Sequence, residues 1–282
     1  MSIFTDEAVR NAFLAAGAMA VACAILSVFV VARRWAFMGE GISHAGFGGA
    51  GTAWMLAVAF PGTFSDPRYP YLFVFIFCFI AAIGIGWLVQ SQRVTNDAAI
   101  GIFLVASLAW GFVGQHIYVH RYHTDPAGFE NLLWGQMKSI TTAYAMWSVI
   151  AAVAVAGITW AMSKELIAYC FDPLLARTSG VRTTLVHYLL MLMLAMTIVI
   201  GSRVVGSVLV TALLVLPAAT GNLLTRRLNR ALAIGIAVSL VGAWGGLLIS
   251  SVWRALPAGS TIVLLMVAEF AAALVVSRFA PR

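Results

Sequence analysis

Glu40 and His44 lie four residues apart in the segment of residues 33–54, which reads RRWAFMGEGISHAGFGGAGTAW. On a helix this spacing places both side chains on one face, one turn apart. A carboxylate oxygen and an imidazole nitrogen so placed can bind one divalent first-row ion, and the pair suits Mn, Fe(II) or Zn better than Cu(I), which prefers sulfur. The pattern predicts a metal site. The alternative is an interfacial carboxylate at Glu40, close to the Arg33–Arg34 pair, with His44 as a hydrogen-bonded packing residue.

A second set of possible ligands is the histidine group at His116, His120 and His123, which is followed by Asp125 and Glu130. Three histidines and a carboxylate could hold Zn. We therefore consider an accessory site that collects metal transiently. The alternative is a polar loop that faces solvent or contacts a binding protein.

Glu269 stands alone in the last apolar run, LLMVAEFAAALVV. A carboxylate in such a segment is costly and is by default a functional hypothesis. It could neutralise a cation in transit as an accessory ligand, or it could pair with Arg203 or Arg254. His187 opens another apolar run and is interpreted as a capping or packing residue.

The composition is that of a membrane protein. Of 282 residues, 62% are hydrophobic and 10% are charged, with a formal net charge of +7. The charged fraction is well below that of soluble domains, which excludes a nucleic-acid-binding domain and a disordered tail. Three dispersed cysteines exclude a disulfide scaffold. The first apolar run has no small-residue cleavage site after it, so we expect a retained span.

The predicted fold class is all-α, a polytopic transmembrane bundle of eight to nine spans in a single domain over residues 1–282. The spans are expected near 12–32, 42–60, 70–90, 99–119, 141–162, 183–201, 204–224, 231–251 and 260–278. Glycines at 46, 48, 49 and 51 predict close approach of a neighbouring helix, and Pro217 predicts a kink or break.

The distribution of Lys and Arg favours an N-terminus outside the cell. It places the longer connection 116–140 outside and the connection 163–182 inside. An eight-span version, with an early segment re-entrant or two late segments merged, stays open.

Several motifs together resemble those of the metal-ion class of ABC importer permeases, the membrane subunits of zinc, manganese and iron uptake systems. The first motif is Arg-Arg followed by Gly-Asp-x-x-Ser-His-Ala, which this chain matches with Glu40 in place of the usual Asp. Others follow in order over residues 33–265: Asp97-Ala98-Ala99-Ile100-Gly101-Ile102, Leu133-Trp134-Gly135, Phe171-Asp172-Pro173 with Ala176 and Gly180, Val205-Gly206 through Leu216-Pro217-Ala218-Ala219, and Leu256-Pro257-Ala258-Gly259.

This resemblance implies a function and an assembly. Two permease copies, identical or related, would line a pathway with Glu40 and His44 from each. An extracytoplasmic metal-binding protein would deliver the ion, and cytoplasmic ABC ATPase subunits would hydrolyse ATP. The expected location is the bacterial plasma membrane, in contact with lipid and with no nucleic-acid partner. No cofactor is expected to be bound permanently, because the divalent ion is the cargo.

The resemblance also implies that the cytoplasmic segment near 170–180 is the coupling helix, with Phe171, Asp172, Pro173, Ala176 and Gly180 as its motif residues. Asp172 and Pro173 are typical of a helix start, and Gly180 could end the helix. Phe171, Leu174 and Leu175 would supply an apolar face for a groove in the ATPase. The alternative is an ordinary amphipathic connector.

Two other function classes stay open. The first is a secondary metal carrier or channel that works without ATP. The second is an intramembrane metalloenzyme, for which a His-Glu-x-x-His pair is typical and is missing from the sequence. The sequence also has no Walker motif, so we expect ATP hydrolysis to take place in a partner chain and this chain not to be an enzyme.

Overall fold

A computed structural model describes residues 7–64, 66, 69–124, 140–253 and 256–279. Within these ranges the chain forms helices and no strand, which confirms the all-α prediction. The helices are α1 (Glu7–Ala32), α2 (Met38–Ala59), α3 (Tyr69–Ser91), α4 (Asn96–Tyr122), α6 (Thr142–Ala161), α7 (Ser163–Phe171), α8 (Pro173–Thr178), α9 (Thr183–Val205), α10 (Ser207–Leu224), α11 (Leu228–Val252) and α12 (Ala258–Phe279).

Eight of the described helices are long and apolar enough to cross a membrane, namely α1, α3, α4, α6, α9, α10, α11 and α12. The chain is therefore a multi-pass membrane protein, as predicted. The ninth long helix, α2, has 22 residues. Its glycines, serine, glutamate and histidine keep it out of the group of eight helices that are apolar enough to span a membrane.

The two ends of α2 nevertheless lie on opposite sides of the bundle. The α2 helix starts just after α1, and Arg33, the residue that follows α1, lines one pocket together with the end of α3 and with α8. At the other end of α2, the Ala57 carbonyl accepts a hydrogen bond of 3.3 Å from Tyr122, the last residue of α4. Since α4 leads away from the pocket, α2 leads away from it too. This arrangement fits the nine-span version of the prediction.

Close packing explains how a helix with polar residues is accommodated. Fifteen of the 22 residues of α2 are buried. A methyl group on Gly51 would lie 2.7 Å from the Cα of Gly111 in α4, and Gly49 is as tightly packed against the backbone of α3 at Phe73. The predicted approach of neighbouring helices to the glycine run is confirmed. Protein, rather than lipid, covers most of α2.

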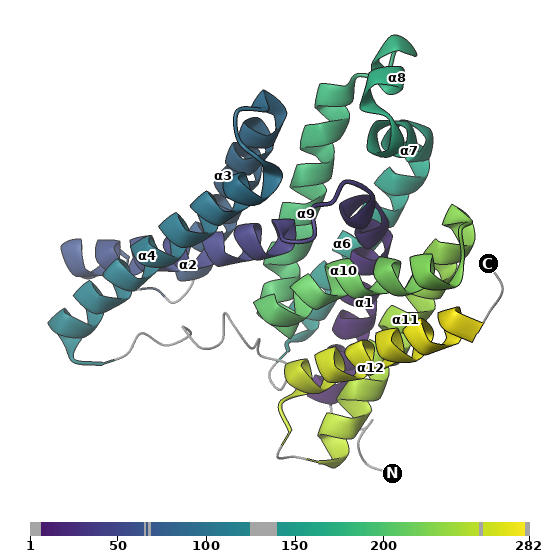
Figure 1. The fold of residues 1–282 in the computed structure, drawn as a ribbon. Helices are drawn as coiled ribbons and strands as arrows, with labels where there is room; N and C mark the ends of the chain where they lie inside the picture. The colour runs from purple at the N-terminus through teal and green to yellow at the C-terminus, as the bar shows by residue number, and fades with distance from the viewer. Residues whose placement is uncertain (1–6, 65, 67–68, 125–139, 254–255, 280–282) are drawn as a thin grey trace.

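Figure 1 shows α2, α3 and α4 side by side on one flank, and α1, α6, α10, α11 and α12 on the other, with α9 between them. We call residues 38–122 the α2–α4 group. Besides its internal contacts, α2 packs on α9 and on α10. The α10 helix runs unbroken through Pro217, so the break considered there is not observed.

Candidate metal site and coupling segment

The first two turns of α2 bring Glu40 and His44 together. The His44 Nδ1 atom lies 3.3 Å from Oε1 of Glu40 and 3.0 Å from the Glu40 carbonyl oxygen. Both Glu40 atoms are acceptors, and the Ser43 hydroxyl lies 3.4 Å from the same nitrogen. The tautomer with its proton on Nδ1 satisfies the contacts with Glu40 and presents the lone pair of Nε2. The Glu40 side chain is 31% exposed and that of His44 is 13% exposed. The pair is therefore held in place but accessible to an ion.

Thr211 of α10 supplies a contact that sequence analysis missed. Its hydroxyl donates a hydrogen bond of 2.9 Å to Oε2 of Glu40. The approach of α10 depends on Gly39, because a methyl group there would lie 3.0 Å from Cδ1 of Leu214. Thr211 is 171 residues from Glu40 along the chain, so no spacing pattern could have indicated it.

The interfacial alternative for Glu40 required a basic neighbour. Among the described residues, neither Arg33 nor Arg34 forms a salt bridge with Glu40, whose carboxylate contacts the His44 ring instead. The guanidinium of Arg33 instead lies over the rings of Trp35, at 5.2 Å, and Tyr169, at 4.6 Å. The carboxylate of Glu40 is thus not neutralised by the adjacent arginines.

A complete metal site is not present within the part of one chain that the structure describes. There, no three His, Cys, Asp or Glu side chains come close enough to hold a metal. A metal ion held by Glu40 and His44 would therefore need further ligands beyond these described side chains.

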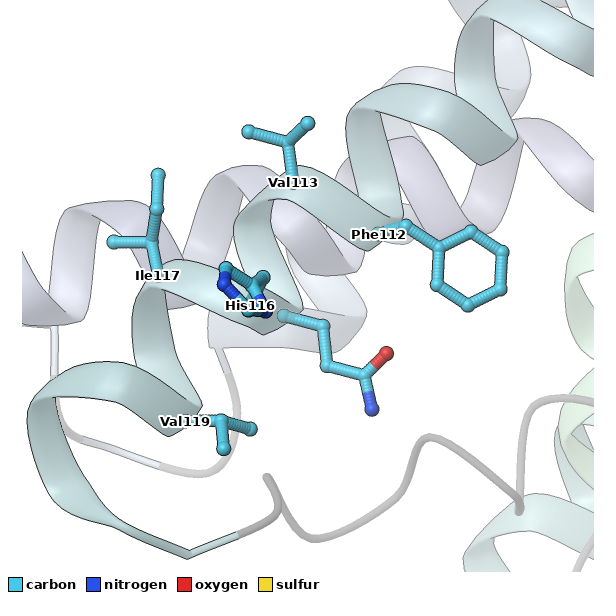
Figure 2. Close-up of a pocket in the computed structure, with 6 residues that line it drawn as sticks. Phe112, Val113, His116, Ile117 and Val119 are labelled. Carbon is cyan, nitrogen blue, oxygen red and sulfur yellow. The ribbon is translucent and has the colours of Figure 1, made fainter.

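The accessory histidines lie elsewhere. The prediction that residue 116 begins a loop is wrong, because α4 continues to Tyr122 and carries His116 and His120 on exposed positions, with His123 as its C-cap. Figure 2 shows His116 among the apolar side chains that line a hollow along α4. Among the described residues the three histidines do not form a metal cluster. The carboxylates at 125 and 130 lie outside the described residues.

Glu269 of α12 is not paired as one interpretation expected. Within the described part of the chain, neither of its buried carboxylate oxygens has a hydrogen-bond partner. Arg203 instead lies over the rings of Tyr71, at 3.6 Å, and Tyr144, at 3.9 Å. The pairing with Arg203 is therefore not formed, and Arg254 lies outside the described residues.

The predicted helix start near residue 172 is present. Oδ1 of Asp172 accepts hydrogen bonds from the backbone N–H groups of Leu174, at 3.0 Å, and Leu175, at 2.9 Å. Pro173 occupies the first helical position, where its missing N–H costs nothing. Gly180 follows the helix with a φ of +85°, a conformation that favours glycine.

The short α8 helix presents an apolar face to its surroundings. Phe171, Leu174 and Leu175 are 67%, 74% and 63% exposed, while Ala176 is buried against the rest of the protein. Three large exposed apolar side chains, one at the end of α7 and two in α8, lie outside the membrane-spanning helices and indicate a contact surface. The predicted apolar face is present, and its role as the coupling helix stays a prediction.

A cluster next to α8 was not anticipated. The buried His187 ring uses both nitrogens, with Nδ1 2.7 Å from the Tyr169 hydroxyl and Nε2 2.9 Å from the Gly86 carbonyl. Trp35 packs edge-on against the same ring. His187 is a packing residue, as interpreted from the sequence, and it joins α7, α3 and α9.

Comparison with known proteins decides the family. Residues 5–277 match the model of the ABC 3 transport family. The chain belongs to the ABC 3 transport family. This confirms the resemblance to metal-ion ABC importer permeases, and with the apolar helices it identifies a multi-pass plasma-membrane permease subunit.

Related members of the ABC 3 family have similar lengths. A probable iron transport system membrane protein of Haemophilus influenzae is 32% identical over 96% of this chain and 94% of its own. The manganese transport system membrane protein MntC of Listeria monocytogenes is 29% identical over 97% of this chain and 91% of its own.

Solved structures agree in fold. PsaBC from Streptococcus pneumoniae, in complex with a Fab, is similar with a TM-score of 0.78 and 25% identity over 96% of this chain and 92% of that one. An inward-facing metal-chelate type ABC transporter shares the fold at a TM-score of 0.65 and 13% identity, over 97% and 87% of the two chains.

Proposed function

We propose that this chain is the permease subunit of an ATP-driven importer of divalent first-row metal ions, with Mn and Fe(II) as its main cargo and Zn as a further candidate. The observation that carries the proposal is the contact between the Glu40 carboxylate and the His44 imidazole in a member of this family. The named relatives transport manganese or iron, and oxygen with nitrogen ligands suits those ions.

Each ligand has a separate role in the proposed transport step. Nε2 of His44 offers its lone pair to the ion, and the carboxylate of Glu40 offsets the charge of an ion that has lost part of its hydration shell. Two ligands do not complete a coordination sphere, so a second permease copy supplies an equivalent pair. A binding protein outside the cell delivers the ion.

ATP acts through other chains in this proposal. Separate cytoplasmic ATPase subunits receive the exposed apolar face of α8 in a groove. Nucleotide binding then favours one of two helix packings, and the site opens to the outside or to the inside. An ATP-independent carrier is the competing function, and uptake by vesicles without ATPase subunits would support it.

The test is uptake of Mn²⁺ and Fe(II) by the reconstituted complex of permease and ATPase. We expect Glu40→Gln and His44→Ala each to lower uptake by more than about 100-fold, since loss of an outer-shell partner alone typically costs 10–100-fold in affinity. Glu165→Gln removes a carboxylate from α7 and serves as the matched control. Wild-type uptake by both site variants would remove the assignment.

A further inference from the structure

We propose that Thr211 is a positioning residue that fixes the Glu40 carboxylate for metal binding and releases it when α2 and α10 separate. This inference rests on the proposed function, because it concerns the same site. Thr211 comes from a helix outside the α2–α4 group and contacts the side chain of Glu40 directly. It therefore connects the candidate ligand to the other half of the molecule.

The hydroxyl has a choice of two acceptors. Oε2 of Glu40 lies 2.9 Å away, and the carbonyl oxygen of Ser207, one turn earlier in α10, lies 3.1 Å away. A hydroxyl has one proton to donate, and a charged carboxylate is the stronger acceptor. The bond to Glu40 therefore dominates when the helices are in contact.

The second acceptor makes the contact reversible. If α2 moves away from α10, the hydroxyl can turn to Ser207 and its proton keeps a partner. Separation then leaves no unsatisfied donor on α10, so it avoids the cost of a buried, unpaired polar group. The freed carboxylate can rotate away from His44, which lowers the affinity of the site for the ion.

The length of Glu40 is matched to this contact. An aspartate at position 40 would be one methylene shorter. On the same backbone, it would retract the carboxylate by up to about 1.5 Å, one C–C bond, and the oxygen would leave hydrogen-bonding range of Thr211. The Thr211 contact thus depends on the length of the glutamate side chain.

The experiment measures KM and maximal rate for Mn²⁺ uptake by the reconstituted complex with its ATPase subunits. We expect Thr211→Val to raise KM by about 10–100-fold, the usual cost of removing an outer-shell partner. Thr211→Ser keeps the hydroxyl and should therefore keep the KM of the wild type. Thr211→Ala should act like Val, which excludes a steric cause. The matched control is Thr220→Val, also in α10, whose hydroxyl donates to the Leu216 carbonyl of its own helix, at 2.8 Å, and to no other described residue.

A double-mutant comparison separates positioning from a general structural effect. In a Glu40→Asp background, where the contact cannot form, Thr211→Val should change KM by less than about 3-fold, because the hydrogen bond that Val removes is already lost and the effects of two coupled residues do not add. An equal KM increase in both backgrounds would overturn the inference. So would equal KM values for Thr211→Val and Thr220→Val. If Glu40→Gln and His44→Ala also transport normally, the proposed function itself fails, which is a different result.

Discussion

At the scale of single residues, His187 and His44 differ in chemistry because their ring nitrogens have different hydrogen-bond partners. Both ring nitrogens of His187 have hydrogen-bond partners, the Tyr169 hydroxyl and the Gly86 carbonyl. Burial raises the pKa of Tyr169 to about 12, against the opposing effect of Arg33, so its phenol keeps its proton and donates to Nδ1. The Nδ1 of His44 faces oxygens of Glu40, and no described residue forms a hydrogen bond with its Nε2.

His187→Phe should therefore lower stability without altering metal affinity. Removing the ring nitrogens leaves the buried Tyr169 hydroxyl without its partner, and an unsatisfied buried group costs about 1–3 kcal/mol. Thermal unfolding of the purified complex measures this change, and Mn²⁺ binding provides the second readout. The control is Tyr188→Phe, which keeps the aromatic ring beside His187. A stability equal to that of the wild type would contradict the role described for His187.

Residue spacing predicted contacts within one helix but not contacts between distant helices. It predicted the meeting of Glu40 and His44, because both lie on one helix and helical geometry fixes their separation. It could not predict Thr211 or Tyr169, whose contacts depend on how distant helices pack. The pairing of Glu269 with Arg203, one of the interpretations considered, is not formed for the same reason, since the arginine lies over two tyrosine rings.

At the scale of elements, the N-cap residue Asp172 stabilises the first turn of α8, which carries exposed apolar side chains. Asp172→Ala removes both side-chain hydrogen bonds to the first turn, and loss of such a cap costs about 1 kcal/mol. Leu174→Glu leaves the helix intact and places a charge on its apolar face. We expect Leu174→Glu to abolish co-purification with the ATPase subunits and Asp172→Ala to weaken it.

The matched control for α8 is Ser179→Glu, an exposed position just after the helix and outside the apolar face. It adds the same charge nearby. Retention of the ATPase by Leu174→Glu, or its loss in Ser179→Glu, would argue against docking through the apolar face.

Gly206 forms the joint between α9 and α10. Its φ of +90° with a ψ of 154° belongs to a region that is essentially restricted to glycine. Gly206→Ala should lower the free energy of unfolding by about 1–3 kcal/mol. Gly157→Ala is the control, because a methyl group there meets no atom within 4 Å. Thermal unfolding of the two variants should differ in direction, since alanine favours the interior of a helix.

The boundaries of the spans were predictable because apolar runs end at charged or turn-forming residues. Two features were not. The α4 helix continues through His116 and His120 to Tyr122, so polar residues alone did not mark its end. The α2 helix can be more polar than a typical span because neighbouring helices cover it. A sequence does not reveal which helices will cover which.

At the scale of the whole molecule, hydrogen bonds fix which helix ends share a side. Glu7 at the start of α1 accepts a 2.7 Å hydrogen bond from Thr142 at the start of α6. The end of α1 meets α8 around one pocket. Figure 1 accordingly shows α7 and α8 at the end of the bundle opposite the start of α1. From the positive-inside rule we expect α8 in the cytoplasm and the start of α1 outside.

Labelling of single cysteines from either side of the membrane tests this topology. In a background without Cys23, Cys78 and Cys170, a membrane-impermeant thiol reagent should label Thr124→Cys in intact cells and Ser179→Cys only after the membrane is opened, because α4 and α8 end on opposite sides. Both positions are exposed. The nine-span arrangement, in which α2 crosses, requires an epitope at the N-terminus to be accessible together with Thr124→Cys. Accessibility of that epitope together with Ser179→Cys would instead establish eight crossings, with α2 entering and leaving on one side.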